Sequence, residues 1–592
     1  MQSIFILPVL MMTASHSNEE VPAAAKAWIE RHAIPLTSVE AENGFDDLRA
    51  LATAIGKARI VALGEPTHGT REAFQLKHRL VEFLASEMGF THFSIEASSP
   101  ESFAIDPYVQ NDPGETRSPE ELIGGMYFWT WNTEEVRDMV TWMRRFNAGN
   151  AERKDARRIH FTGFDMQTPN VAATIVRSYL EAHDTALLER SEKTLDDAVA
   201  LRLTGPRSTF GVATGSFPCD SARGKKIVFR GWIRTQDLTD GRAGLWWRAD
   251  GPDGATLAFD NMQDRGPSGT SEWAEYSLAL DVPSEVVNIN FGALMAGDGK
   301  AWFDDLTVEL DGVAFDAPSS FDFSFETSSI RGLYCPQSAD YRTGLSTEQP
   351  HGGEQCLEIA RTKQSVDETA PSASDVRADV DALHAEMLEK RDAYAVAAGT
   401  RASEWAIHNA RILVQYAEMM ARTENPTSVN IRDRSMAENV AWLLEQNPNA
   451  KVVLWAHNAH VGRQRESMGE YLEKRFQGEM VVIGFATSSG DYTAVGGAGL
   501  TSHELQAPPS RSIESYLASA DKPVFLLDLR AAKRDDAASA WLTEAMPMRS
   551  IGARAMEQQF FPTVARESYD VLAYIRDTTA ARQLASKTAR AR

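Results

Sequence analysis

Four short clusters of carboxylate and imidazole side chains each follow an apolar, β-branched run of the sequence. In chain order, the side chains in these clusters are Glu65, His68, Glu96, Asp165, His457 and His460. Open α/β sheets bind ligands just beyond the carboxyl ends of their strands, so we expect these side chains to share one rim. A neutral imidazole can activate a water molecule, and a carboxylate can fix the tautomer of that imidazole. The pattern therefore predicts acid–base chemistry without a covalent nucleophile.

The same residues are compatible with two other interpretations. His457 and His460 have a spacing typical of metal ligands, and with Glu65 or Glu96 they could form a nitrogen and oxygen site of the zinc type. Alternatively, a single histidine or glutamate after a strand is often only a loop residue or a helix cap. Because four clusters occupy the same position relative to predicted strands, a shared site is favoured over isolated loop residues.

Several standard hydrolase and phosphate-binding signatures are absent from the sequence. The chain has no G-x-S-x-G elbow, no H-E-x-x-H zinc helix and no complete Walker A or G-x-G-x-x-G phosphate loop. These absences disfavour a serine hydrolase of the usual α/β type.

The elements that would position the clusters have an α/β pattern in two separate parts of the chain. Strands are predicted at residues 59–63, 91–95, 159–161, 452–455, 480–485, 523–527 and 569–575. Residues 70–88 place apolar side chains on one face and predict a helix. Long helices are also predicted after residue 374. We therefore expect an α/β fold with a mixed or mostly parallel central sheet, flanking helices and a helical segment.

A β-rich stretch interrupts this α/β pattern. Between residues 205 and 364 the chain has short strands of alternating apolar residues, separated by Gly, Pro, Asp and Asn turns. Such spacing is typical of a sandwich or jelly roll. We predict four regions, namely a signal peptide at 1–18, the first part of an α/β domain at 19–204, an inserted all-β jelly-roll domain at 205–364 and the second part of the α/β domain at 365–592.

Composition and charge restrict the partners and the compartment. The 592 residues include 60 Lys and Arg against 83 Asp and Glu, and the net charge of −23 argues against nucleic acid as a partner. The longest apolar run, residues 4–12, has the length of the apolar part of a signal peptide but is too short to span a bilayer. We therefore expect an exported protein, periplasmic or extracellular, without a transmembrane segment. Cys335 and Cys356 could form a disulfide after export.

At the residues of the four clusters the sequence resembles the erythromycin esterase family. The resemblance is carried by residues 61–70 (VALGEPTHGT), 94–97 (SIEA), 129–133 (WTWNT), 163–165 (GFD), 432–433 (RD) and 455–461 (WAHNAHV). Members of that family hydrolyse the lactone ester of macrolide antibiotics. The resemblance therefore implies a small-molecule ester or lactone substrate, an activated water, and no metal or other cofactor.

The resemblance also implies roles for individual residues. His68 would be the general base, with Glu65 orienting or polarising it. Glu96, His457 and His460 would shape the pocket, handle protons or stabilise the oxyanion. The residues implied in substrate binding are Arg71, Lys77, Asp165 and Arg432. Lys77 stands where the family typically has a basic residue, often an arginine, and a lysine lacks the bidentate fork of an arginine. Asp165 and Arg432 could instead form a structural ion pair.

The β-rich insert resembles a galactose-binding jelly roll, a shape shared with carbohydrate-binding modules. This resemblance implies a glycan as a partner. Two interpretations stay open for its tryptophans, because they could line a sugar-binding surface or pack in the core or against another domain. The tryptophans concerned are Trp246, Trp247, Trp273 and Trp302.

We predict a hydrolase of the erythromycin esterase type that cleaves an ester or macrolactone by His- and Glu-assisted attack of water and could confer macrolide resistance. The alternative is an exported protein that holds a ligand, a metal or a glycan at the same rim without turnover. Stoichiometric zinc or iron that is lost in a His457→Ala/His460→Ala variant would favour the alternative.

Overall fold

The computed structural model describes most of the chain. The described residues are 21–150, 157–204, 210–251, 255–317, 321–327, 330–333, 335, 340–361, 372–422, 430–496, 499–556 and 558–584. The predicted signal peptide at residues 1–18 lies outside them, as do the predicted boundaries of the insert near residues 205 and 364.

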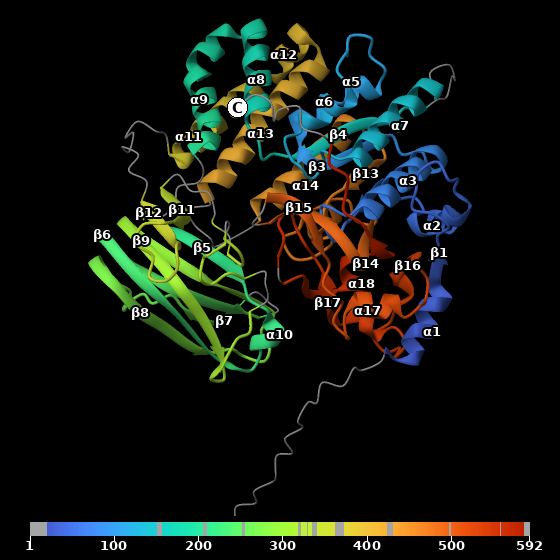
Figure 1. Ribbon diagram of the computed structural model, residues 1–592. Coiled ribbons are helices and arrows are strands. Elements are labelled where there is room, and N and C mark those ends of the chain that lie inside the picture. The colour runs from blue at the N-terminus through green and yellow to red at the C-terminus, as the bar shows by residue number, and fades with distance from the viewer. Residues whose placement is uncertain are drawn as a thin grey trace, which may run out of the picture.

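One sheet organises the α/β part of the chain (Figure 1). Its strands lie in the order β1 (Ala33–Pro35), β16 (Val524–Asp528), β19 (Val571–Thr578), β14 (Met480–Gly496), β2 (Ile60–Leu63), β13 (Val452–Trp455), β3 (His92–Ser98) and β4 (His160–Asp165). The strands from β19 to β4 run parallel, whereas β16 is antiparallel to both of its neighbours. β15 (Gly499–Glu504) extends β14 as a hairpin. The predicted mixed, mostly parallel sheet is confirmed, and strands from the two parts of the chain interleave in it.

The central strands β2 and β13 are buried at every position because helices cover both faces of the sheet. On one face, Val61 and Val453 share a core with α3 (Arg71–Met88) and α7 (Glu134–Asn150). On the other face, Ala62 and Leu454 share a core with α14 (Ile431–Gln446) and α16 (Met468–Arg475). The shorter elements of the α/β part are α1 (Ala23–His32), α2 (Arg49–Ile55), α4 (Ser99–Phe103), α5 (Asp106–Val109), α6 (Pro119–Gly124), α15 (Asn458–Val461), α17 (Ile513–Ala518), α18 (Ala565–Ser568), β17 (Ala545–Arg549) and β18 (Phe560–Val564).

A separate group of helices forms the predicted helical segment, at the top of Figure 1. Its members are α8 (Asn170–His183), α9 (Thr185–Thr204), α11 (Ala373–Glu389), α12 (Arg391–Ala398) and α13 (Thr400–Arg422), and they share one core. The β-rich insert follows α9, and the helical segment resumes at α11. These two helices contact each other, with an ion pair of 2.6 Å between Arg190 and Glu386. Because the two helices that flank the insert pack against each other in the core of the helical segment, the insert does not interrupt the packing of its host.

Residues 210–361 form a second, all-β unit with its own core. Its strands are β5 (Phe210–Ser216), β6 (Lys226–Asp250), β7 (Thr256–Asp260), β8 (Gly269–Asp281), β9 (Asn288–Leu310), β10 (Val313–Ala314), β11 (Tyr341–Ser346) and β12 (Cys356–Arg361), with α10 (Cys219–Ala222) between β5 and β6. The long strands β6 and β9 pair along most of their length, with shifts in register between Gln236 and Arg242. The predicted all-β insert is confirmed, whereas its jelly-roll topology and a glycan partner stay predictions.

Individual predictions for the insert have different outcomes. Trp247 and Trp302 have no exposed surface, so these two side chains pack in the interior. Cys335 and Cys356 are free thiols in the structure, so the predicted disulfide is not formed. Over the described part of the chain, no helix is both long enough and apolar enough to cross a membrane.

Gly163 in β4 provides a test of the packing beside the rim. A Cβ atom at this position would lie 2.3 Å from the Ser102 hydroxyl and 2.6 Å from the Ala97 carbonyl oxygen. We therefore expect Gly163→Ala to lower the free energy of unfolding by about 1–3 kcal/mol in urea denaturation, because the backbone of β3 cannot move away. Gly149→Ala is the matched control, since nothing lies within 4 Å of its Cβ position and alanine is the better helix former. Equal stability of the two variants would contradict this account.

Candidate active site

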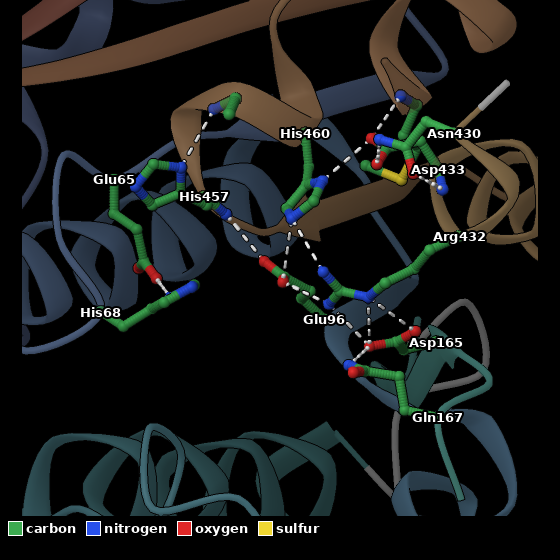
Figure 2. Close-up of polar contacts among 12 residues, drawn as sticks. Glu65, His68, Glu96, Asp165, Gln167, Asn430, Arg432, Asp433, His457 and His460 are labelled. Carbon is green, nitrogen blue, oxygen red and sulfur yellow. Dashed lines mark hydrogen bonds and ion pairs between the residues drawn. The ribbon is translucent and has the colours of Figure 1, made fainter. Parts of the chain in front are cut away.

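The rim at the carboxyl ends of β2, β3, β4 and β13 brings the predicted site residues together (Figure 2). Glu65 and His68 follow β2, and Glu96 lies in β3. Asp165 is the last residue of β4, and His457 and His460 follow β13. The prediction that these clusters would share one rim thus agrees with their placement in the structure.

Glu65 and His68 form a hydrogen-bonded pair. Nδ1 of His68 lies 2.6 Å from Oε1 of Glu65. A carboxylate can only accept at this distance, so Nδ1 carries the proton of this bond, and Nε2 is the nitrogen that offers a lone pair when the ring is neutral. No hydrogen bond to Nε2 is formed by any residue that the structure describes, and the side chain of His68 is 10% exposed. The pair therefore has the arrangement of a general base with its orienting carboxylate.

The second oxygen of Glu65 is held by two further donors. Oε2 accepts from Nζ of Lys77 at 2.5 Å and from the indole N–H of Trp455 at 2.8 Å. Burial alone raises the pKa of Glu65, but the Lys77 ammonium and the His68 ring lower it overall. Burial also lowers the pKa of Lys77 to about 8. The Lys77 side chain has no exposed surface, so its ammonium is placed to balance the charge of Glu65.

Glu96, Arg432 and Asp165 form a second ionic cluster on the rim. Nη2 of Arg432 donates to Glu96 at 2.6 Å and to Asp165 at 2.8 Å. The other oxygen of Glu96 accepts from the backbone N–H of His457 at 2.9 Å. Burial alone raises the pKa of Glu96, but His460 and Arg432 hold it well below the usual range. Arg432 keeps 23% of its side chain exposed, whereas Asp165 has no exposed surface.

His460 is connected to this cluster and to one further carboxylate. Its Nδ1 donates to Asp433 at 2.9 Å, and its Nε2 lies 3.0 Å from Nη1 of Arg432 and 3.3 Å from Glu96. Asp433 in turn accepts from the backbone N–H of Met468 at 2.8 Å. Burial lowers the pKa of His460, but the carboxylates of Glu96 and Asp433 raise it overall. His460 therefore holds a proton more readily than an ordinary histidine.

His457 has a different environment from His68 and His460. Its Nδ1 accepts from the backbone N–H of Ala459 at 3.2 Å, and its Nε2 donates to the carbonyl oxygen of Ile551 at 3.1 Å. Burial lowers the pKa of His457 to about 3, and the neighbouring His68 adds to this. The ring is therefore neutral with both nitrogens occupied, and it lies 5.1 Å from the ring of His68.

One of the predicted residues lies apart from the rim clusters. Arg71 makes an ion pair of 3.5 Å with Glu135 of α7 and lines a separate cavity beside α3. In the described part of the chain, no group of three or more His, Cys, Asp or Glu side chains is arranged to hold a metal ion. Glu65 and Glu96, which the zinc-type interpretation would need, each bind a cationic side chain.

Three residues of the site were not assigned a role from the sequence. Trp455 binds Glu65, Asp433 binds His460, and the indole of Trp131 donates to the carbonyl oxygen of Glu96 at 2.8 Å. The ring of Trp131 also lies edge-on to that of His68, with centroids 5.8 Å apart. All three belong to the short motifs noted above, so membership of a motif was the available signal.

Replacing Lys77 tests whether its ammonium balances Glu65. In Lys77→Met, Glu65 stays buried without its cation, and we expect the free energy of unfolding to fall by about 3–5 kcal/mol at pH 8. The pKa of Glu65 in this folded variant would lie above that of the unfolded chain. Stability would therefore be retained at low pH and lost as the pH rises through the new pKa, which urea denaturation at pH 5.5 and pH 8 would measure.

The matched control for this experiment removes both charges. Lys77→Met/Glu65→Gln should recover most of the stability lost in Lys77→Met, since no uncompensated charge is left in the interior. A Lys77→Met variant that is equally stable at both pH values, or a double variant that recovers nothing, would contradict the assignment.

The titration of His460 tests whether the charge of Asp433 raises the pKa of this histidine. Asp433→Asn keeps the shape of the hydrogen-bonding group but removes its charge, so the pKa of His460 should fall. NMR titration of histidine labelled with ¹³C would measure the change. Glu438→Gln is the control on the same helix, because Glu438 binds Arg411 and Arg434 instead. An unchanged His460 titration in Asp433→Asn would show that Asp433 is only structural.

Comparison with known proteins places this chain in a family. The family model described as erythromycin esterase matches residues 85–215 and 340–578, and the gap between these ranges falls in the all-β insert. The putative hydrolase YbfO of Bacillus subtilis (strain 168) is 30% identical over 197 residues, which are 31% of this chain and 41% of that protein. Erythromycin esterase type II of Escherichia coli is 29% identical over 139 residues, which are 24% of this chain and 31% of that protein. The alignments thus span less than half the length of these curated relatives.

A solved structure supports the fold. A mutant of the erythromycin esterase EreC in its open conformation superimposes with a TM-score of 0.52 at 12% identity, over 93% of this chain and 98% of that chain. At this identity the likeness concerns the fold alone. Because the family model matches more than half of the chain, the protein belongs to the erythromycin esterase family.

Proposed function

We propose that the protein is a hydrolase that cleaves an ester or macrolactone by general-base attack of water. The observation that carries this proposal is the pair of Glu65 and His68. The buried carboxylate holds Nδ1 of the ring, and in the described part of the chain nothing is hydrogen-bonded to Nε2. Membership of the erythromycin esterase family supports a hydrolase of this class.

In the proposed reaction, Nε2 of His68 takes a proton from a water molecule while the water oxygen attacks the carbonyl carbon. Glu65 stabilises the imidazolium that forms. The tetrahedral intermediate then collapses, the carbon–oxygen bond of the ester breaks, and the imidazolium returns its proton to the leaving oxygen. The products are a carboxylic acid and an alcohol, which remain joined when the substrate is a lactone.

We assign the other residues by their exposure and contacts. Lys77 and Asp165 have no exposed surface, so we assign them to positioning Glu65 and Arg432 rather than to substrate contact. Arg432 and His460 keep some exposed surface and together favour positive charge, so we assign them to the oxyanion of the intermediate. His457 is neutral with both nitrogens bonded to backbone, and in our proposal it forms a wall of the pocket beside His68.

Macrolactones are the first substrates to test, and their hydrolysis would make macrolide resistance the biological outcome. Support for this choice comes from the partial match to the relative named erythromycin esterase type II. Simple esters belong in the same panel, because none of the roles assigned to the described rim residues depends on the size of a lactone ring.

The test compares wild type with His68→Ala on this panel, with mass spectrometry detecting the addition of one water. We expect wild type to hydrolyse at least one member and His68→Ala to be slower by roughly 10² to 10⁴, as is usual when a general base is removed. Glu65→Gln should also be severely slowed. His183→Ala, at an exposed histidine of α8, is the matched control and should retain full activity.

Each outcome decides one part of the proposal. Equal hydrolysis by wild type and His68→Ala would reject His68 as the base but keep the enzyme class. Absence of hydrolysis across the whole panel would contradict the proposed function and favour a protein that binds its ligand without turnover.

A further inference from the structure

Arg549 is the last residue of β17, and it has no exposed surface. Its guanidinium makes four hydrogen bonds to oxygen atoms of the chain. Nε donates to the carbonyl oxygen of Thr487 at 3.1 Å, and Nη2 donates to the carbonyl oxygens of Ser488 at 3.1 Å and Gln506 at 2.7 Å. Nη1 donates to the side-chain oxygen of Gln559. The guanidinium therefore joins β17 to β14, to the segment after β15 and to the segment before β18.

The carboxylate that balances the charge of Arg549 is buried as well. Oε1 of Glu514, in α17, accepts from the backbone N–H of Arg549 at 2.8 Å, and Glu514 has no exposed surface. Burial lowers the pKa of Arg549 to about 10 and raises the pKa of Glu514 to about 7, so both groups are largely ionised at pH 8. A buried ion pair adds little net stability compared with apolar residues of similar size. Its presence here therefore points to a role in fixing one arrangement of the chain.

Two residues after Arg549, Ile551 contacts two loops of the rim. The backbone N–H of Ile551 donates to the carbonyl oxygen of Pro66 at 2.8 Å, and Ile551 pairs with Thr67 in a parallel bridge. The carbonyl oxygen of Ile551 accepts from Nε2 of His457 at 3.1 Å. Because a single residue separates Ile551 from Arg549, the position of Arg549 restricts where Ile551 meets these loops.

We propose that Arg549 is a positioning residue for the candidate active site. By fixing the chain at the end of β17, it places the carbonyl oxygen of Ile551 so that the ring of His457 has one orientation and one tautomer, with the proton on Nε2. It also holds the backbone of residues 66–67, which directly precede His68. The rings of His457 and His68 lie 5.1 Å apart. This inference rests on the proposed function, because His68 is the proposed general base.

The test removes both buried charges, so that neither is left unpaired in the interior. Arg549→Met/Glu514→Gln retains an acceptor for the backbone N–H of residue 549 but loses the four hydrogen bonds of the guanidinium. The measurement is NMR of the full chain labelled with ¹⁵N in histidine, at pH 8 and without substrate, and His457→Gln assigns the signals. In wild type we expect well-separated Nδ1 and Nε2 signals for His457, because one nitrogen carries the proton. In the double variant the two signals should move towards each other, because the ring then exchanges between tautomers.

Two further variants separate positioning from a general loss of stability. Arg549→Lys keeps the charge but lacks the planar fork, so it should change the His457 signals in the same direction. The matched control Arg79→Met/Asp47→Asn removes another buried ion pair, whose partners lie in residues 38–47, and should leave the His457 signals as in wild type. The inference is overturned if the His457 signals are unchanged in every folded Arg549 variant, or if the control alters them to the same extent.

The same variants test the consequence for catalysis. With an ester that wild type hydrolyses, Arg549→Met/Glu514→Gln should lower kcat by roughly 10- to 100-fold with little change in KM, because a misplaced general base affects the transition state more than substrate binding. An unchanged kcat would overturn the role of Arg549 in the reaction. The NMR measurement needs no turnover, so a failure of this inference can be distinguished from a failure of the proposed function.

Discussion

The carboxylate of Glu65 is cut off from water, and the arrangement of the whole rim depends on how its charge is balanced. A buried, unpaired carboxylate is strongly unfavourable, so the fold must supply donors. Three elements do so, with His68 on the loop after β2, Lys77 on α3 and Trp455 at the end of β13. The same contacts that neutralise Glu65 also fix the ring of His68 in one orientation. At this position the interactions that stabilise the buried charge are therefore also the ones that orient the proposed general base.

Neighbouring parallel strands make these contacts possible. β13 lies between β2 and β3, so the groups that follow β2 and β13 and the side chain of Glu96 in β3 reach the same edge. The register places Trp455 opposite Leu63, two residues before Glu65. Parallel strands are joined by crossovers, and the chain between β4 and β13 also holds the helical segment and the all-β insert. The residues that meet here are therefore separated by as many as 390 positions, as between Glu65 and Trp455.

The three histidines of the rim differ through their partners rather than their type. A carboxylate holds one nitrogen of His68 and leaves the other without a hydrogen-bond partner in the described chain. Burial keeps the ring of His457 neutral, and backbone groups bind both of its nitrogens. Carboxylates flank His460 and raise its pKa. Sequence spacing alone treats His457 and His460 as an equivalent pair, and only their surroundings distinguish them.

Much of the fold was predictable because it is encoded in local patterns. The strand at residues 452–455 was predicted with the bounds that the structure has, since an apolar run between polar turns is a local signal. The change to alternating strands likewise revealed the all-β insert. By itself, the sequence determined which residue types follow each strand and hence that they would meet at one rim. Only the tertiary structure decided that Lys77 would be buried against Glu65, that Asp433 would bind His460, and that the guanidinium of Arg549 would bind carbonyl oxygens of β14. These contacts depend on how distant elements pack side by side, and no local pattern of the chain carries that information.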